Sequence, residues 1–155
     1  MPRPPSSTSP FWRVFRVATR LDAYLLRATG GRRSFISRAP TLVLHDVGRR
    51  SGQERVTPLI YLDRAPDLVV VASKGGTDRH PAWFHNLTAM TTARVDLPGG
   101  ESRFVRPRVA GPEEKAELWP RLVELFPDYA TYATYTERDI PVVVLEPDGP
   151  APEQP

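Results

Sequence analysis

The apolar run Leu-Val-Val-Val-Ala at 68–72 limits the possible folds of this chain more than any other feature of its sequence. A short run rich in β-branched residues, bounded by turn residues on both sides, is typical of a strand buried on both faces. Here the bounding segments are Arg-Ala-Pro-Asp at 64–67 and Ser-Lys-Gly-Gly at 73–76. We therefore expect a central strand over 68–73 that lies inside a folded domain.

Other segments of the chain complete a mixed helix and strand pattern. The predicted strands cover residues 41–47, 55–62, 68–73, 93–97, 102–109 and 140–147. The predicted helices cover residues 11–29, about 81–90, 112–126 with a kink or break at Pro120, and 127–138. Strands joined by tight hairpins with helices between them indicate an α+β fold with a mainly antiparallel sheet, open or curled into a barrel. Pro58 cannot donate to a strand ladder, so we expect an edge or a bulge there.

The length and composition favour one domain over residues 11–147, with a disordered N-terminus at 1–10 and a disordered tail at 148–155. The absence of cysteine excludes disulfides, zinc–thiolate sites and thiol nucleophiles. The three histidines, His45, His80 and His85, lack the spacing of a metal site. No apolar stretch is long enough to span a bilayer, and the polar N-terminus lacks a secretory core, so we expect a cytoplasmic protein.

The charge of the chain is strongly polarised. Residues 1–110 hold 18 Lys and Arg against 8 Asp and Glu, whereas residues 111–155 hold 3 against 10. This asymmetry favours an anionic partner for the first part, although a general preference for arginine would also produce it. We do not expect nucleic acid, because aromatic residues do not interleave with the basic ones. The basic amphipathic helix at 11–29 either packs on its own domain or contacts a membrane surface.

Three segments are candidates for a binding site. The first is Gly48-Arg49-Arg50-Ser51-Gly52 with Arg55, in which open backbone and guanidinium groups suit phosphate or carboxylate. A solvated hairpin turn would have the same composition. The second is Ser73-Lys74-Gly75-Gly76, where backbone amides and an ammonium group form a possible anion-binding nest. The third is Tyr129, Tyr132 and Tyr135, whose spacing places them near one face of a helix, either in the core or beside a planar substrate.

Four blocks of the chain together resemble one known family. They are GRRSGQERVTPLIYL, LVVVASKGG, HPAWFHNL and LWPRLVELFPDYATYATYTERDIPVVVLEP. The chain is similar over about residues 20–147 to the deazaflavin-dependent nitroreductases, the F420H2-dependent quinone reductase group of the split β-barrel oxidoreductases found in actinobacteria. The resemblance implies a split β-barrel related to the FMN-binding flavin reductases. It also implies hydride transfer from reduced coenzyme F420 to a quinone, or promiscuously to nitroaromatics and activated enones.

The resemblance also implies roles for individual residues. The phosphate and oligoglutamate tail of F420 would lie on Arg49, Arg50 and Ser51, with help from Lys74. The deazaflavin ring would be lined by Arg55, Val56, Thr57, Pro58, Leu59 and Ile60, with Ala72, Ser73, Lys74 and Gly75 opposite. The helix start would close the pocket through Ala82, Trp83, Phe84, His85 and Asn86. Tyr129, Tyr132 and Tyr135 would form the substrate side, and the hydroxyls of Ser73, Tyr129 and Tyr132 would stabilise negative charge on the acceptor.

Two alternatives and one departure accompany this interpretation. The alternatives are a non-catalytic binder of deazaflavin or lipid on the same fold, and an FMN-dependent reductase of the related branch. FMN is less favoured because it carries no glutamate tail to explain an extended basic segment. The departure is the segment His45-Asp46-Val47 before Gly48, where relatives commonly have a run of threonines. A carboxylate at Asp46 near a phosphate site would repel the ligand unless it pairs with Arg49 or Arg50. Relatives are often monomers or weak dimers, which leaves the assembly open.

Overall fold

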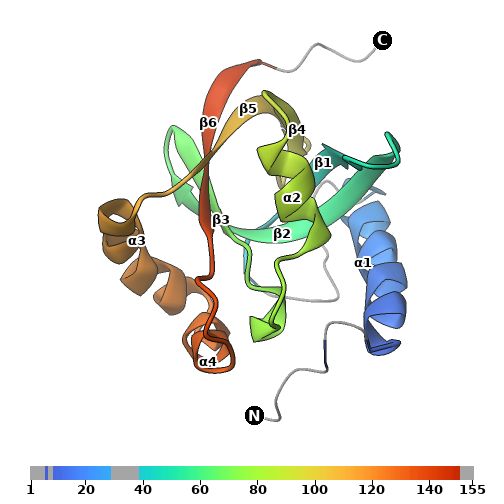
Figure 1. Ribbon diagram of the computed structural model, residues 1–155. Coiled ribbons are helices and arrows are strands. Elements are labelled where there is room, and N and C mark those ends of the chain that lie inside the picture. Colours follow the sequence, from blue (N-terminus) through green and yellow to red (C-terminus); the bar gives the residue numbers. More distant parts are fainter. Residues whose placement is uncertain (1–5, 7–8, 29–38, 151–155) are drawn as a thin grey trace.

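The computed structural model describes residue 6 and residues 9–28 and 39–150. Its helices are α1 (Phe11–Ala28), α2 (Ala82–Thr88), α3 (Pro112–Leu125) and α4 (Asp128–Thr134), together with a 3₁₀ turn, η1 (Lys74–Gly76). Its strands are β1 (Thr41–Val47), β2 (Glu54–Arg64), β3 (Asp67–Val71), β4 (Ala93–Asp96), β5 (Ser102–Val109) and β6 (Val142–Pro150). The strands form a closed antiparallel barrel in the order β1-β2-β3-β6-β5-β4 (Figure 1). The predicted α+β fold with a mainly antiparallel, barrel-forming sheet is therefore confirmed.

Two apolar clusters lie on the two faces of the barrel wall. Alternate residues of β1, such as Leu42 and Leu44, join the larger cluster inside the barrel, because successive side chains of a strand point to opposite faces. Trp83 and Leu87 of α2 add to this cluster. Val69 and Val71 of β3 point the other way, into a second cluster beneath α3 and α4. The run at 68–72 is buried on both faces, as its composition predicts.

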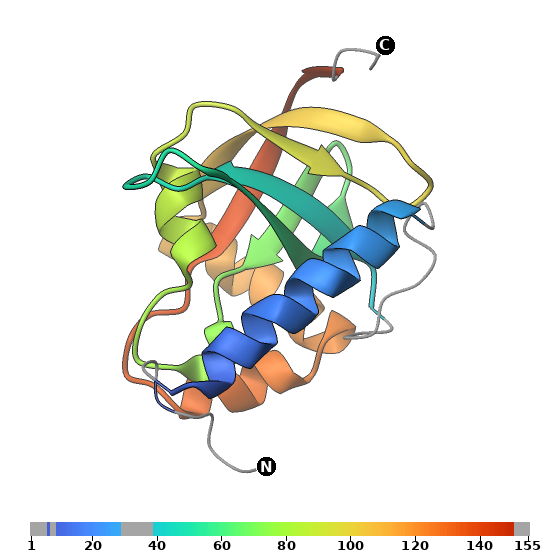
Figure 2. The ribbon, with the colours of Figure 1, turned by 90° about the vertical axis from the view of Figure 1, so that its right-hand side faces the viewer.

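Helix α1 packs against β2 and β1 and crosses the outside of the barrel (Figure 2). Much of its apolar side faces solvent: Phe11 is 50% exposed, Val14 70% and Leu21 61%. Asp22, in contrast, is buried. Helix α1 therefore carries the apolar residues that the sequence pattern predicts, but Phe11, Val14 and Leu21 do not pack into the core. No helix in the described part of the chain is long and apolar enough to cross a membrane.

Several element boundaries differ from those predicted. Helix α4 ends at Thr134 rather than at residue 138, so Tyr135 lies beyond the helix. Helix α3 continues through Pro120 without a break. Strand β6 continues to Pro150 because residues 148–150 still lie beside β5, three residues past its predicted end. Most of the predicted N-terminal disorder and residues 151–155 of the tail lie outside the described residues.

Candidate active site

Strand β2 has an open edge along its first half. Its pairing with β1 runs without a register shift from Glu54 to Ile60, whereas β3 pairs only with Tyr61–Arg64. Among the described residues, positions 54–60 therefore have a strand neighbour on one side only. Residues 56–60 are all partly exposed, although 41–46 on β1 are all buried. The predicted edge at Pro58 is confirmed.

The turn between β1 and β2 brings basic residues next to α2. The amide of Gly48 donates to the carbonyl of Gln53 at 2.8 Å, and the amide of Arg49 donates to Oδ1 of Asn86 at 3.1 Å. Arg49 and Arg50 are exposed. The pKa of His85 on α2 is lowered, first by burial and then by the charges of Arg49 and Arg50, so these groups lie near one another. This end of the molecule offers several donors to an anion.

Asp46 lies on β1, just before this turn, and its side chain is buried and hydrogen-bonded. It is fully buried, and its two oxygens accept hydrogen bonds from Asn86 Nδ2 at 2.6 Å and from Thr57 Oγ1 at 3.3 Å. Burial raises the pKa of Asp46, and the two hydrogen bonds and the charge of Arg55 oppose that shift. The side-chain hydrogen bonds of Asp46 thus go to Asn86 and Thr57, rather than to the side chains of Arg49 or Arg50 that the sequence suggested. The buried carboxylate ties α2 to β1 and β2.

The loop after β3 has an unusual backbone. Lys74, Gly75 and Gly76 have φ values of 43°, 63° and 75° in succession. Only glycine adopts such angles without strain, so the Gly75-Gly76 pair permits this turn and Lys74 adopts it at some cost. Gly76 is buried against the backbone of Tyr132 on α4. The loop therefore turns out of the barrel where the edge of β2 is open.

One residue that the sequence did not single out fixes this loop. The guanidinium of Arg138, in the segment between α4 and β6, donates to the carbonyls of Ser73 at 2.8 Å and Thr77 at 2.7 Å. It also contacts Nδ1 of His80 at 3.0 Å. The rings of His80 and Phe84 are 5.0 Å apart, which connects the loop to α2. No local spacing predicts these contacts, because Arg138 lies more than 55 residues along the chain from each partner.

The predicted residues of α2 and β2 divide between two environments. Trp83 and Asn86 are buried, whereas Ala82 is exposed and Phe84 and His85 are partly exposed. On β2, Thr57 and Leu59 lie opposite Leu44 and Leu42 and share their inner face. Val56, Pro58 and Ile60 point to the other face. A ligand along β2 could therefore contact the backbone edge of all residues 56–60, but the side chains of only every second residue.

The three tyrosines do not share one role in the structure. Tyr129 is 5% exposed, and its ring packs against Phe126 and Trp119 with centroid distances of 5.0 and 6.4 Å. Burial raises its pKa. Tyr129 is thus a core residue with little surface for a substrate, in contrast to the expected wall of three rings. Tyr132 and Tyr135 are partly exposed and remain the candidates for substrate contact.

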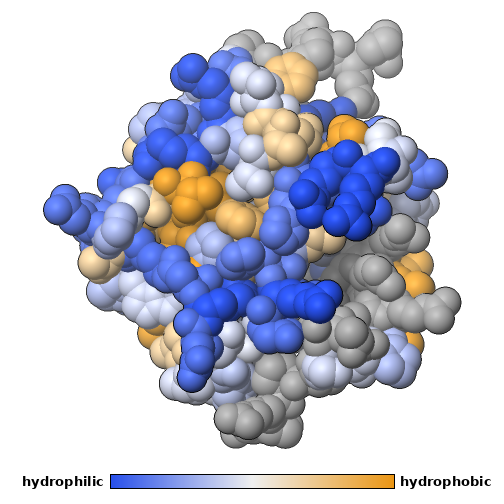
Figure 3. Space-filling view, viewed as in Figure 1, coloured by the Kyte–Doolittle hydropathy of each residue, from blue (hydrophilic) through white to orange (hydrophobic). Residues whose placement is uncertain are grey.

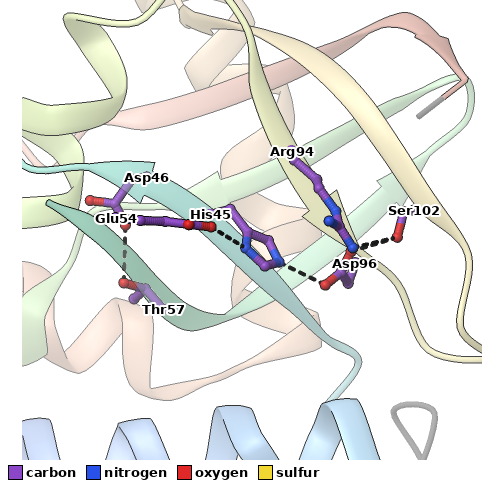
Figure 4. Close-up of polar contacts among 7 residues, drawn as sticks. All are labelled: His45, Asp46, Glu54, Thr57, Arg94, Asp96 and Ser102. Carbon is purple, nitrogen blue, oxygen red and sulfur yellow. Dashed lines mark hydrogen bonds and ion pairs between the residues drawn. The ribbon is translucent and has the colours of Figure 1, made fainter. Parts of the chain in front are cut away.

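A second polar network lies on the other face of β1 (Figure 4). His45 is 7% exposed and contacts Asp96 Oδ2 through Nε2 at 2.7 Å and Glu54 Oε1 through Nδ1 at 3.3 Å. Asp96 in turn accepts from Ser102 at 2.6 Å. His45 and Asp46 are neighbours in sequence and therefore point to opposite faces of the strand. In the described residues no group of three or more His, Asp or Glu side chains is arranged to hold a metal.

The family model described as F420H(2)-dependent quinone reductase matches residues 18–147. The chain belongs to this family. It is an oxidoreductase family whose members use coenzyme F420, as the resemblance implied. The F420H(2)-dependent quinone reductase Rv1261c of Mycobacterium tuberculosis is 36% identical over 132 residues, which cover 81% of this chain and 87% of that protein. Rv3178 of the same organism, assigned by name to the same family, is 39% identical over 108 residues, covering 70% and 90% of the two chains.

Solved structures agree with the family assignment. The structure of an F420-H2 dependent reductase, FDR-A, has a TM-score of 0.59 and 35% identity and covers 69% of this chain and 94% of its own. A structure described as a domain-swapped dimer has a TM-score of 0.61 and 32% identity and covers 89% and 100%. The split-barrel fold expected from the resemblance is therefore confirmed in this reductase.

Proposed function

We propose that this reductase binds F420 between the β1–β2 turn, the open edge of β2, the η1 loop and the start of α2. The observation that carries the proposal is the open edge at 54–60, flanked by exposed Arg49 and Arg50 at the β1–β2 turn. A flat ring can lie along exposed strand backbone, and a tail of carboxylates needs guanidinium donors. The η1 loop adds the backbone amide of Gly75, which is in the positive-φ conformation that suits a turn around an anion; the amides of Gly76 and Thr77 already donate within the loop.

The chain's own residues would bind and orient the cofactor and stabilise the negative charge that develops on the acceptor. Reduced F420, when bound, supplies a hydride for the acceptor. Arg49, Arg50 and Ser51 would hold the phosphate and tail, with Lys74 on the other side. The open edge of β2 and the backbone of 72–75 would orient the ring and bring the acceptor within reach. The hydroxyls of Ser73 and Tyr132 would donate to the acceptor oxygen as negative charge develops there. Tyr129 would support Tyr132 from the core.

The acceptor that fits the family is a quinone, with nitroaromatics and activated enones as promiscuous substrates. A quinone with a lipid tail is held in a bilayer, so the exposed apolar side chains of α1 support peripheral contact with a membrane surface. The four arginines that the sequence places in α1 would attract anionic lipid headgroups. Cytoplasmic location and a monomeric or weakly dimeric state stay predictions.

The test is oxidation of F420H2 by the purified protein, followed by the return of oxidised-cofactor absorbance with and without a soluble menaquinone analogue. Quinone-dependent oxidation is the expected result. A parallel titration with FMN tests the related branch, and binding of FMN without F420 would overturn the cofactor assignment. Tight F420 binding without turnover by any quinone, nitroaromatic or enone would favour the non-catalytic binder. Flotation with anionic vesicles, compared between the wild type and Val14→Glu, tests the membrane contact of α1.

A further inference from the structure

Few hydrogen bonds within the loop between β3 and α2 hold its backbone in place. Within the loop, the amide of Gly76 donates to Ser73 and that of Thr77 donates to Lys74, at 2.9 and 3.3 Å. The three successive positive φ values turn the backbone away from any strand partner. A loop with so few internal bonds opens easily unless another part of the protein ties it down.

Arg138 binds both ends of this loop with one rigid group. Its Nε donates to the carbonyl of Thr77, and its terminal nitrogens donate to the carbonyls of Ala72 and Ser73. A guanidinium is planar with donors in a fixed fork, so these acceptors are held at fixed positions relative to one another. Lysine could not reproduce this pattern, because its single nitrogen reaches fewer acceptors in a defined plane.

The same guanidinium extends the connection to α2. One terminal nitrogen of Arg138 lies 3.0 Å from Nδ1 of His80, which must accept the hydrogen bond and so remain neutral at that nitrogen. Burial and the charge of Arg138 lower the pKa of His80. His80 in turn lies against the rings of Phe84 and His85 at centroid distances of 5.0 and 5.7 Å. One arginine therefore joins the loop to the start of the helix on the far side of the candidate site.

We propose that Arg138 is a positioning residue, which holds the Ser73–Thr77 loop in the conformation that binds the cofactor. This inference rests on the proposed function, since the loop is assigned there to cofactor binding. Arg138 itself need not touch cofactor or substrate. Its role is to fix the carbonyls of the loop, so that the amide of Gly75 and the side chain of Ser73 are already arranged when the cofactor binds. Such arrangement lowers the cost of ordering on binding.

The first test needs no cofactor. Hydrogen exchange of the amides at 74–77 is measured in the wild type, in Arg138→Lys and in Arg108→Gln without ligand. Arg108 is a matched control, because its guanidinium also makes several bonds, to Glu114 and Glu146, but on the side of α3. We expect exchange at 74–77 to become at least about tenfold faster in Arg138→Lys and to stay unchanged in Arg108→Gln, since loss of local bonds raises local opening.

The second test uses the loaded enzyme. Arg138→Lys should raise the KM for F420H2 by about tenfold, the factor that 1.4 kcal/mol gives, while Arg108→Gln leaves it unchanged. Arg138→Gln is measured in the same way, because it removes any contacts that a lysine at position 138 still makes. If both Arg138 variants show the hydrogen exchange of the wild type and a KM within twofold of it, the role of Arg138 is overturned while the proposed function stands. Absence of F420 binding by the wild type would overturn the proposed function and this inference with it.

Discussion

Gly76 lies against the backbone carbonyl of Tyr132, so closely that a methyl group at position 76 would overlap the carbonyl oxygen. This contact joins the η1 loop to α4 and thereby brings the loop at the end of β3 next to the helix that carries the tyrosines. Gly76 is also at a φ of 75°. A side chain at this position would be both strained and obstructed.

Replacement of Gly76 by alanine should therefore cost more stability than the same change at Gly52. Gly52 has a φ of 68° but nothing within 4 Å of an added Cβ. Gly52→Ala should cost about 1–2 kcal/mol from backbone strain alone. Gly76→Ala should add roughly 1–3 kcal/mol from overpacking. Urea unfolding at pH 7 measures both, and equal losses in the two variants would show that the contact with Tyr132 is not as close as described.

The buried carboxyl of Asp46 should make stability depend on pH in an unusual direction. Burial raises its pKa above the ordinary value of 3.8 despite the hydrogen bonds from Asn86 and Thr57. At pH values between the ordinary pKa and the raised pKa, the folded protein holds a proton that the unfolded chain has lost. The contribution of Asp46 to stability therefore falls as the pH rises. The free energy of unfolding of the wild type, minus that of Asp46→Asn, should be smaller at pH 7 than at pH 4.

A second variant, Asp46→Ala, measures the cost of removing the hydrogen-bond acceptor itself. Asp46→Ala leaves Nδ2 of Asn86 buried without its acceptor, which should cost about 1–3 kcal/mol. A pH-independent difference between the wild type and Asp46→Asn would show that the pKa of Asp46 is not raised. Urea unfolding across pH 4–7 gives both results from one set of proteins.

Asp96 should behave in the opposite sense. Burial alone would raise the pKa of Asp96, but the hydrogen bonds from His45 and Ser102 and the charges of His45 and Arg94 outweigh it and lower the pKa. Its stabilising contribution is present above pH 3.8 and is lost as the pH falls toward the lowered pKa. Asp96→Asn should cost about 1–3 kcal/mol at pH 7.

Because the His45 network lies on the face of β1 away from Asp46, Asp96→Asn should leave the KM for F420H2 unchanged. Steady-state kinetics at a temperature where the variant is folded checks this. Ser102→Ala, which removes one of the bonds to Asp96, should show a smaller loss of stability and the same KM. A raised KM in both variants would place the network in the site rather than behind it.

The tyrosines should separate into a core residue and a substrate residue. Tyr129 is buried among Phe126 and Trp119, so Tyr129→Phe should keep kcat within about twofold, whereas Tyr129→Ala should cost about 3–5 kcal/mol of stability. Tyr132→Phe should lower kcat by about tenfold or more if its hydroxyl donates to the acceptor. A larger loss of kcat in Tyr129→Phe than in Tyr132→Phe would reverse these assignments.

Local patterns in the sequence predicted most of the strands, because hairpin turns and apolar runs are determined by neighbouring residues. The open edge at Pro58 was also predictable, since proline lacks the amide that an inner strand needs. The contacts that complete the candidate site were not. Asp46 meets Asn86 across 40 residues, and Arg138 meets Ser73 across 65. The sequence predicted a helix to residue 138, whereas the helix ends at Thr134 and leaves Tyr135 outside it.

The most direct test of the account is the dissociation constant of F420 for the wild type, for Arg49→Gln/Arg50→Gln and for Arg121→Gln, by fluorescence titration at two salt concentrations. Arg121 is an exposed arginine on α3 and serves as the control. We predict that the double variant binds at least about tenfold more weakly, since hydrogen bonds to charged groups contribute about 1.5–3 kcal/mol each. Its affinity should also depend less on salt, while Arg121→Gln matches the wild type. Equal affinity in all three proteins would contradict the placement of F420 at the β1–β2 turn.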